Sequence, residues 1–429
     1  MPRRRPRTAA AGAALSPARY GRSMATAAST VPSGPAHVAV VSFLAARAAP
    51  AGGFWIALAG GVAIARVAER RGARLGFGAS IAAMLETVAI IGPARLGIPL
   101  TQAATAPMLG RLEARGWRAL PQILACSAIR LLHNTATTAF FIWVITGGLD
   151  AYAGTYDAIG RRVGLEIGSA DALALTLAGL LAWAAFASTV QVLIYRRGLA
   201  SWDRLAADEP KVMHAIHAKD SVRPRERRFD PRAIALAAAV AFGLLLASTA
   251  WALLAAVALW LTVAWGAARP DKQPLKAGLL FAALLAGGAF AFGLGGGLGL
   301  DVAARRAARA ALLVLTATWL RGAAGADGLR EVSGRVLGRL RRLPALPEAS
   351  LVLDQIASEG RLAAAARTLE EQLRGVPKRA VPFVDAVLHW VVREASVRRE
   401  APGRIAMELS ARPVDLVLLI GAVLPALAL

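Results

Sequence analysis

The sequence predicts an all-α, polytopic integral membrane protein with about eight membrane-spanning helices, within a range of roughly six to ten. Three observations support this fold class. Of the 429 residues, 56% are hydrophobic and only 18% are charged, and the mean hydropathy is +0.51, whereas soluble domains are about a quarter charged. The apolar residues form long blocks, and basic loops separate these blocks. A helix of about 20 apolar residues crosses the ~30 Å hydrocarbon core of a bilayer.

The segment before the first apolar block is basic. Residues 1–36 contain six arginines and no acidic residue, and the first acidic residue of the chain is Glu69. We therefore expect a disordered cytoplasmic arm. An organellar transit peptide is the alternative, because such peptides are also rich in Arg, Ala and Ser and poor in acids.

The apolar blocks predict two transmembrane domains, at residues 37–195 and 233–320. The first two blocks are short and are separated by Pro50, so we expect one broken or re-entrant element there. The block at 233–268 is too long for one span and is expected to fold back near Ala247, Ser248 and Thr249. The complete set of blocks is 38–49, 53–67, 75–92, 119–147, 170–195, 233–268, 277–300, 307–320 and 416–429.

The loop charges predict the orientation. The loop at 196–232 holds ten basic and six acidic residues, and 66–74 is also basic, so both are expected on the cytoplasmic side. Residues 147–169 are more acidic and are expected outside. The predicted location is the plasma membrane, with the N-terminus in the cytoplasm. The net charge of +23 is interpreted as an orientation signal that faces anionic lipid, not as a nucleic-acid-binding surface.

The C-terminal third differs from the rest. Residues 321–412 carry sixteen basic and eleven acidic side chains but keep an amphipathic rhythm, with Val384, Val387 and Val391 on one helical stripe. This pattern predicts a cytoplasmic or interfacial module of about four amphipathic helices. The segment at 413–429 is a final half-span or a hydrophobic tail.

The sharpest polar signal lies inside the apolar block at 119–147. Arg130, His133 and Asn134 share one helical face, and a charge at mid-membrane costs at least about 2.5–3.5 kcal/mol. Glu86, in the block at 75–92, is the expected partner of Arg130. These four residues are candidates for the lining of a substrate path or a proton or anion relay. The alternative is a structural ion pair and hydrogen-bond cluster that holds helices together.

Other motifs carry less information. The Gly/Pro-interrupted stretch at 90–102 is typical either of a broken helix that lines a transport path or of a cytoplasmic elbow. His214 and His217 have no third metal ligand nearby. The single cysteine, Cys126, excludes a disulfide framework within the chain and multi-cysteine metal sites. No metalloprotease, hydrolase or phosphate-loop motif occurs, so the sequence predicts no metal and no cofactor, and it disfavours an enzyme.

The features from about residue 228 to 394 follow a recognisable order. A polar, proline-containing start at 228–232 precedes two short apolar helices, a basic turn at 269–276, an arginine-rich helix start at 305–309 and long amphipathic helices. This order resembles the transmembrane component of energy-coupling-factor (ECF) transporters. The resemblance implies two kinds of partner, namely ATPase subunits and a substrate-binding membrane subunit.

In that family, each coupling helix carries an Ala-Arg-Gly-like triplet whose arginine inserts into a groove of the ATPase. The first matching position in this chain keeps Arg374 and Gly375, and the second has Arg398 without the glycine. The literal triplet occurs in the other half of the chain, around Arg115. The resemblance therefore implies Arg374, Gly375, Arg398 and Arg115 as coupling candidates.

Three functions remain open at this stage. The first is a transport-complex subunit for a small molecule or metal ion, with a substrate path in the first half and a coupling scaffold in the second. The next is a non-catalytic membrane scaffold that binds a cytoplasmic partner. The last is a membrane enzyme acting on lipid-linked substrates, which would require His133 near one membrane face.

Overall fold

The described part of the chain is helical throughout. The computed structural model describes residues 33–49, 52–93, 99–162, 164–207, 228–270, 272–340, 342–359, 362–377, 379–396 and 409–428, and no strand occurs within these ranges. Of the expected arm at 1–36, all but the last four residues lie outside the described residues, and so does most of the expected basic loop at 196–232.

The first half contains seven α-helices among its described residues, and short glycine-containing breaks separate several of them. Gly72 and Gly92 end α3 and α4 with φ values of +94° and +87°, which an L side chain rarely adopts. The elements are α2 (Gly34–Ala48), α3 (Gly53–Arg71), α4 (Ala73–Ile91), α5 (Pro99–Ala114), α6 (Ala119–Phe140) with its π-helical end η2 (Phe141–Thr146), α7 (Leu149–Arg161) and α8 (Ser169–Ala207).

The second half begins with the predicted fold-back. Helix α9 ends at Ala247 and α10 begins at Trp251, and the Ala250 N–H donates to Ser248 Oγ in the connection (3.1 Å). The break predicted near Ala247, Ser248 and Thr249 is therefore confirmed. The elements are α9 (Pro231–Ala247), α10 (Trp251–Ala268), α11 (Lys272–Gly295), α12 (Leu300–Arg339), α13 (Leu346–Glu359), α14 (Leu362–Leu373), α15 (Ala380–Ser396), α16 (Pro413–Val423) and η3 (Leu424–Ala428).

Five helices in the described residues are long and apolar enough to cross a membrane, which supports a membrane-embedded α-helical protein. The predicted number of about eight spans is not confirmed. Helix α9 and the α16–η3 segment are apolar but too short. The five candidate spans are Ala73–Ile91, Ala119–Thr146, Ser169–Ala207, Trp251–Ala268 and Pro274–Gly295.

Helices α2 and α3 form a buried hairpin. The position of a Cβ on Gly60 would lie 2.2 Å from Ser42 Cβ, so the two helices pack with almost no space between them. Most of both helices is buried. The expected broken or re-entrant element is thus two helices that fold back on each other, with Pro50 between them outside the described residues.

The amphipathic helices of the C-terminal third do not form a separate module. The apolar faces of α13, α14 and α15 join the hydrophobic core of α2 to α5, which we call the first core. Trp390 of α15 is fully buried there, and its indole N–H donates to Thr368 Oγ1 of α14 (3.0 Å). The sequence pattern correctly gives these helices an apolar face, but this face covers the first half of the chain.

A second core joins four helices of the second half. Apolar side chains of α9, α10, α12 and α16 pack together, and Trp260 stacks edge-on against Trp319 with ring centroids 5.3 Å apart. At one end of this core, the Asp230 N–H donates to Asp415 Oδ1 (2.8 Å) and the Arg412 N–H donates to Asp415 Oδ2 (2.7 Å). These bonds fix the start of α16 to the start of α9.

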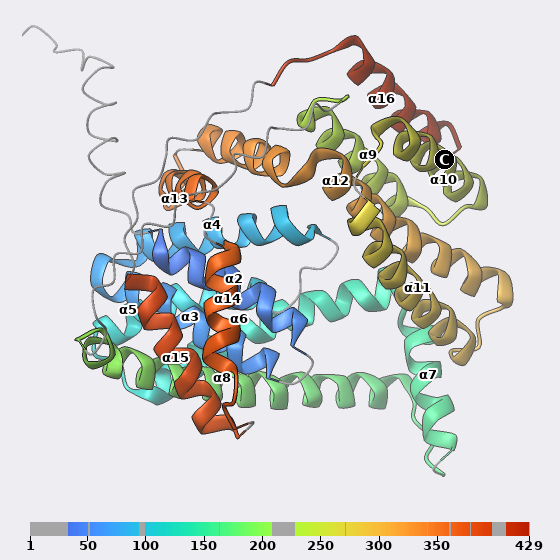
Figure 1. The fold of residues 1–429 in the computed structure, drawn as a ribbon. Helices are drawn as coiled ribbons and strands as arrows, with labels where there is room; N and C mark the ends of the chain where they lie inside the picture. The colour runs from blue at the N-terminus through green and yellow to red at the C-terminus, as the bar shows by residue number, and fades with distance from the viewer. Residues whose placement is uncertain are drawn as a thin grey trace, which may run out of the picture.

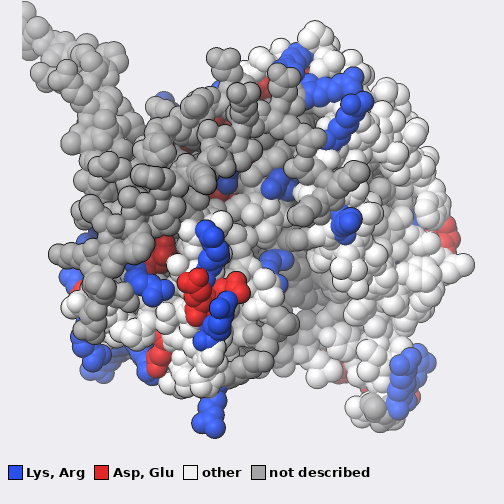
Figure 2. Space-filling model, viewed as in Figure 1, with Lys and Arg blue, Asp and Glu red and all other residues white. Residues whose placement is uncertain are grey.

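The surface divides by polarity. Large apolar side chains are exposed on the outer faces of α6, α8, α10, α11 and α16, for example Leu132 (73% exposed), Leu259 (68%) and Val417 (70%). In Figure 1 the helices of the second core lie on the side away from α14 and α15, and in Figure 2 that side carries few charges. In the same view, charged side chains gather over α14 and α15. Uncharged apolar faces suit contact with lipid.

Candidate functional site

The candidate site lies where α5, α6 and α8 meet. On α6, the side chains of Gln122, Cys126 and Arg130 are buried, while Leu124 and Leu132 are exposed. Because residues four apart lie on the same helical face, α6 presents one polar stripe to the protein and apolar side chains on its opposite face. Arg130 lies near the middle of the candidate span Ala119–Thr146 and is only 5% exposed.

A chain of hydrogen bonds connects the three helices. Arg130 Nη2 donates to Gln191 Oε1 on α8 (2.7 Å), and Cys126 Sγ donates to the same oxygen (3.3 Å). The amide nitrogen of Gln191 donates to Thr105 Oγ1 on α5 (2.9 Å). Thr105 Oγ1 in turn donates to the Thr101 carbonyl (2.9 Å). We call the set Thr105, Cys126, Arg130, Ser188, Gln191 and Tyr195 the Arg130 cluster.

One nitrogen of the Arg130 cluster, Arg130 Nε, is buried without a hydrogen-bond partner. The Tyr195 hydroxyl interacts with the Gln191 and Gln102 side chains, and Ser188 interacts with Cys126. Ser188 is fully buried and Tyr195 is 1% exposed. Among the described residues, Arg130 also has no ion-pair partner, and its side chain contacts the Gln191 amide and Cys126. Burying an unpaired donor and an uncompensated charge is costly.

The predicted pair between Glu86 and Arg130 is wrong. Glu86 on α4 is fully buried, and Arg330 on α12 binds both of its oxygens through Nε (2.7 Å) and Nη2 (2.5 Å). Burial by itself lowers the pKa of Arg330, but the hydrogen bonds and charge of Glu86 outweigh it, and the pKa is raised. Glu86 thus has a complete two-point partner from the second half of the chain.

Helix α12 makes two further contacts with the first half through arginines. Arg321 Nε donates to the Ile90 carbonyl near the end of α4 (2.8 Å). Near the start of α12, Arg306 binds the carbonyls of Thr146 and Gly147, and Arg309 binds that of Val144. These two arginines satisfy carbonyls at the end of the π-helical turn η2, which closes α6. A non-helical Gly325 (φ 61°, ψ 171°) lies between Arg321 and Arg330.

The other two predicted path residues are only partly buried. His133 and Asn134 lie one turn beyond Arg130 on α6, and both have intermediate exposure. The His133 carbonyl accepts a hydrogen bond from Thr137 Oγ1 (2.9 Å). The structure therefore includes Arg130 in a polar cluster, joins Glu86 to α12, and leaves His133 and Asn134 at the margin.

Sequence reasoning missed most of the Arg130 cluster. Tyr195, the last residue of the apolar block at 170–195, is buried against Gly61, where a Cβ would lie 1.8 Å from the Tyr195 hydroxyl oxygen. Ser188, Gln191 and Tyr195 are spaced by three and four residues, so they share one face of α8. This spacing of polar residues in an apolar block is the signal that predicts a buried polar stripe.

The predicted coupling residues lie apart from this cluster. Arg374 and Gly375 form the turn after α14, with Arg374 exposed, 3.7 Å from Glu370, and Gly375 at φ +83°. Arg115 is exposed in the turn after α5. Arg398 lies outside the described residues.

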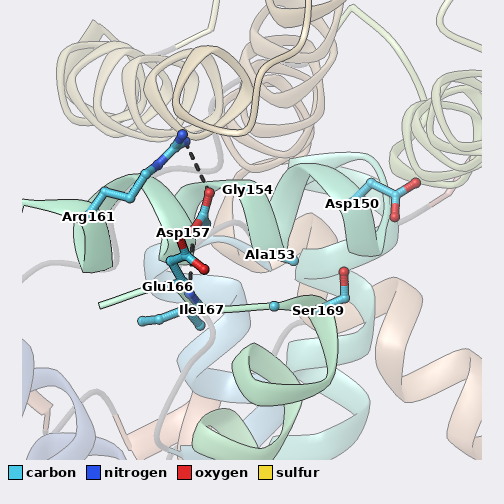
Figure 3. Close-up of a pocket in the computed structure, with 9 residues that line it drawn as sticks. Asp150, Ala153, Gly154, Asp157, Arg161, Glu166, Ile167 and Ser169 are labelled. Carbon is cyan, nitrogen blue, oxygen red and sulfur yellow. Dashed lines mark hydrogen bonds and ion pairs between the residues drawn. The ribbon is translucent and has the colours of Figure 1, made fainter. Parts of the chain in front are cut away.

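An open, acidic pocket of about 540 Å³ lies beside α7 and the start of α8 (Figure 3). Asp157 in its wall pairs with Arg161 (3.0 Å) and accepts from the Ile167 N–H (3.4 Å). Asp150 and Glu166 also line it. Within the described part of the chain, no group of three or more His, Cys, Asp or Glu side chains is arranged to hold a metal ion.

No protein family, curated protein or solved structure matches this chain. The geometry of the Arg130 cluster and the resemblance of residues 228–394 to the ECF transmembrane component are therefore the two indications of function.

Proposed function

We propose that the protein is an integral membrane subunit of a transport complex and that the Arg130 cluster is part of its solute path. The observation that supports this proposal is the burial of Arg130 near the middle of a membrane-length helix without a carboxylate partner among the described residues. An ionisable group inside a membrane is expensive, so such groups generally face a ligand, a partner or a water-filled path. A purely structural cation would be expected to have an acid beside it, as Arg330 does.

The contacts of α12 support a coupling role for the second half. Arg306 and Arg309 of α12 bind carbonyls at the end of α6, the helix that carries Arg130. The same helix binds Glu86 through Arg330. A movement of α12 would therefore act on two helices of the first half, as a coupling scaffold requires.

The energy source in this proposal is an ATPase bound on the cytoplasmic side of the plasma membrane. The exposed Arg374–Gly375 turn is the proposed docking point, with Arg115 as a second one, and a substrate-binding membrane subunit completes the complex. The basic ends of α3 and α8 lie together, because Arg70 pairs with Asp203 (2.8 Å). By the positive-inside rule, this end of the bundle faces the cytoplasm, and so does the N-terminus.

The test is co-purification from native membranes in mild detergent. We expect an ATPase to accompany the wild-type protein and the Arg374→Ala variant to retain less of it, with unchanged yield and folding. Arg162→Ala is the matched control, because Arg162 is also exposed but follows α7 and precedes the start of α8, the end of that helix away from Asp203. Recovery of the protein from native membranes with no ATPase would remove the energy source and overturn the transport proposal.

A membrane scaffold is the second candidate function, and the charged surface over α14 and α15 favours it (Figure 2). Such a scaffold binds a cytoplasmic partner but needs no solute path, so its Arg130 cluster would never open to water. The lipid-linked enzyme lacks comparable support, since His133 lies near the middle of its 28-residue span, not near one end.

A further inference from the structure

We infer that the Arg130 cluster binds a small anionic solute, one that carries a carboxylate or another oxyanion. This inference rests on the proposed transport function and specifies its substrate class. Arg130 Nε, the cluster nitrogen without a hydrogen-bond partner, is a donor, and the Ser188 and Tyr195 hydroxyls can also donate.

The hydrogen bonds within the cluster determine the orientation of the Gln191 amide. The amide nitrogen of Gln191 is engaged by Thr105 Oγ1, whose own hydrogen donates to the Thr101 carbonyl. The Gln191 oxygen must therefore face Arg130 and Cys126, and it already accepts from both. A neutral amide oxygen shared between two donors leaves the positive charge of Arg130 uncompensated.

An oxyanion supplies what the cluster lacks. A carboxylate has two oxygens that accept several hydrogen bonds, so it can accept from Arg130 Nε and offset the charge of Arg130. A cationic solute would meet the charge of Arg130 without any carboxylate in the cluster to offset it. The ligand would thus stabilise a site that is costly when empty.

The position of the cluster favours a free solute over a lipid headgroup. Arg130 lies eleven residues from the start of α6, or about 16 Å along the helix axis. The opposite face of α6 carries exposed apolar side chains, such as Leu124 and Leu132, on both sides of this level. Headgroups lie at the membrane surface, so an anion at this depth must reach Arg130 through the protein.

Cys126 provides the test, because it is the only cysteine of the chain and bonds to the same Gln191 oxygen as Arg130. The intact protein, purified in its native complex and placed in vesicles, is treated with two methanethiosulfonates of similar size. One carries a sulfonate and the other a trimethylammonium group. Mass spectrometry measures both labelling rates, each normalised to its rate with a free thiol in solution.

We expect the anionic reagent to label Cys126 at least about tenfold faster than the cationic one, because Arg130 attracts the first and repels the second. Both reagents react with the same thiolate, so the ratio of rates does not depend on how much thiolate is present. Arg130→Met should bring the ratio close to one. Tyr195→Phe removes one donor and keeps the ring, so it should reduce the ratio and leave the preference for the anion.

The outcomes separate this inference from the proposed function. Equal normalised rates, or faster labelling by the cation, would show a path that admits water but does not select anions, and would overturn the inference alone. No labelling by either reagent in the folded complex, with full labelling after denaturation, would show a permanently closed cluster. That result would overturn both the anion site and the solute path.

Discussion

Two buried arginines, one in each half of the chain, have different surroundings. Arg330 on α12 meets Glu86 through two hydrogen bonds, and its side chain is 15% exposed. Arg130 on α6 is 5% exposed and donates to the amide oxygen of Gln191, with no carboxylate paired to it among the described residues. The charge of Arg330 is neutralised by a carboxylate of the protein, whereas no carboxylate among the described residues pairs with Arg130.

The two arginines show two ways in which a charge can be buried, namely with a carboxylate partner and without one. A buried ion pair with good geometry roughly balances its desolvation cost, so it fixes how helices meet without adding much stability. A buried cation without an acid has no such balance, and its cost must be offset by the rest of the fold. The same residue type thus connects two halves of the molecule in one place, and in the other it is the basis of the proposed solute path.

The largest predicted effect is the loss of one partner of the Glu86–Arg330 pair. Glu86→Gln should lower the free energy of unfolding by about 3 kcal/mol, because it removes the buried acid of Arg330 and leaves only the exposed Asp327 (2.6 Å) to pair with this charge. Thermal or denaturant unfolding in detergent measures this. The double variant Glu86→Met with Arg330→Met should recover most of the loss, since neither charge remains. A double variant as unstable as the single one would show that the pair is not a closed unit.

A much smaller effect on stability is predicted for Arg130. Arg130→Met removes a buried charge that has no acid to lose, so the free energy of unfolding should stay within about 1 kcal/mol of the wild-type value or rise above it. The same unfolding experiment gives the direct comparison with Glu86→Gln. If Arg130→Met were as destabilising as Glu86→Gln, the contrast between the two arginines would fail and Arg130 would be a structural residue.

The smallest effect is predicted for a third pair, at the edge of the second core. Burial raises the pKa of Asp230, but the hydrogen bonds from the Arg232 side chain and N–H outweigh it, so the pKa lies below its ordinary value of 3.8. A carboxyl with a depressed pKa stabilises the fold above the unfolded pKa and loses this contribution as pH falls through the folded pKa.

The wild-type protein should therefore exceed Asp230→Asn in stability by about 1 kcal/mol at neutral pH, and this difference should shrink as the pH falls below about 4 and disappear below the depressed pKa of Asp230. Unfolding temperatures of both proteins in detergent, measured from pH 7 to pH 3, test the sign. A difference that grows on acidification would mean that Asp230 is protonated in the folded state.

The sequence predicts single helices better than it predicts their neighbours. The break after Ala247 follows from length, because 36 apolar residues exceed one span, and the structure confirms it. Arg130 stands out because a charge in an apolar block is costly wherever the block packs. Both conclusions depend on local properties of the chain.

Partners depend on tertiary packing and could not be predicted in the same way. Glu86 and Arg330 are separated by 244 positions, and nothing near either residue indicates the other. Likewise, the amphipathic pattern of α15 predicts an apolar face, but only the packing reveals that this face covers α2 and α3. The burial of Tyr195 could not be predicted for the same reason, because its contact with Gly61 depends on how α3 and α8 pack.

Gly325 has a mechanical consequence for α12. An unbroken helix of 40 residues would be about 60 Å long, and a displacement of one end would move the other end with it. At φ 61° and ψ 171° the chain leaves the helical path, and glycine alone tolerates this conformation without strain. Arg306, Arg309 and Arg321 therefore lie on one helical segment of α12 and Arg330 lies on another, and the direction of the chain changes between them at Gly325.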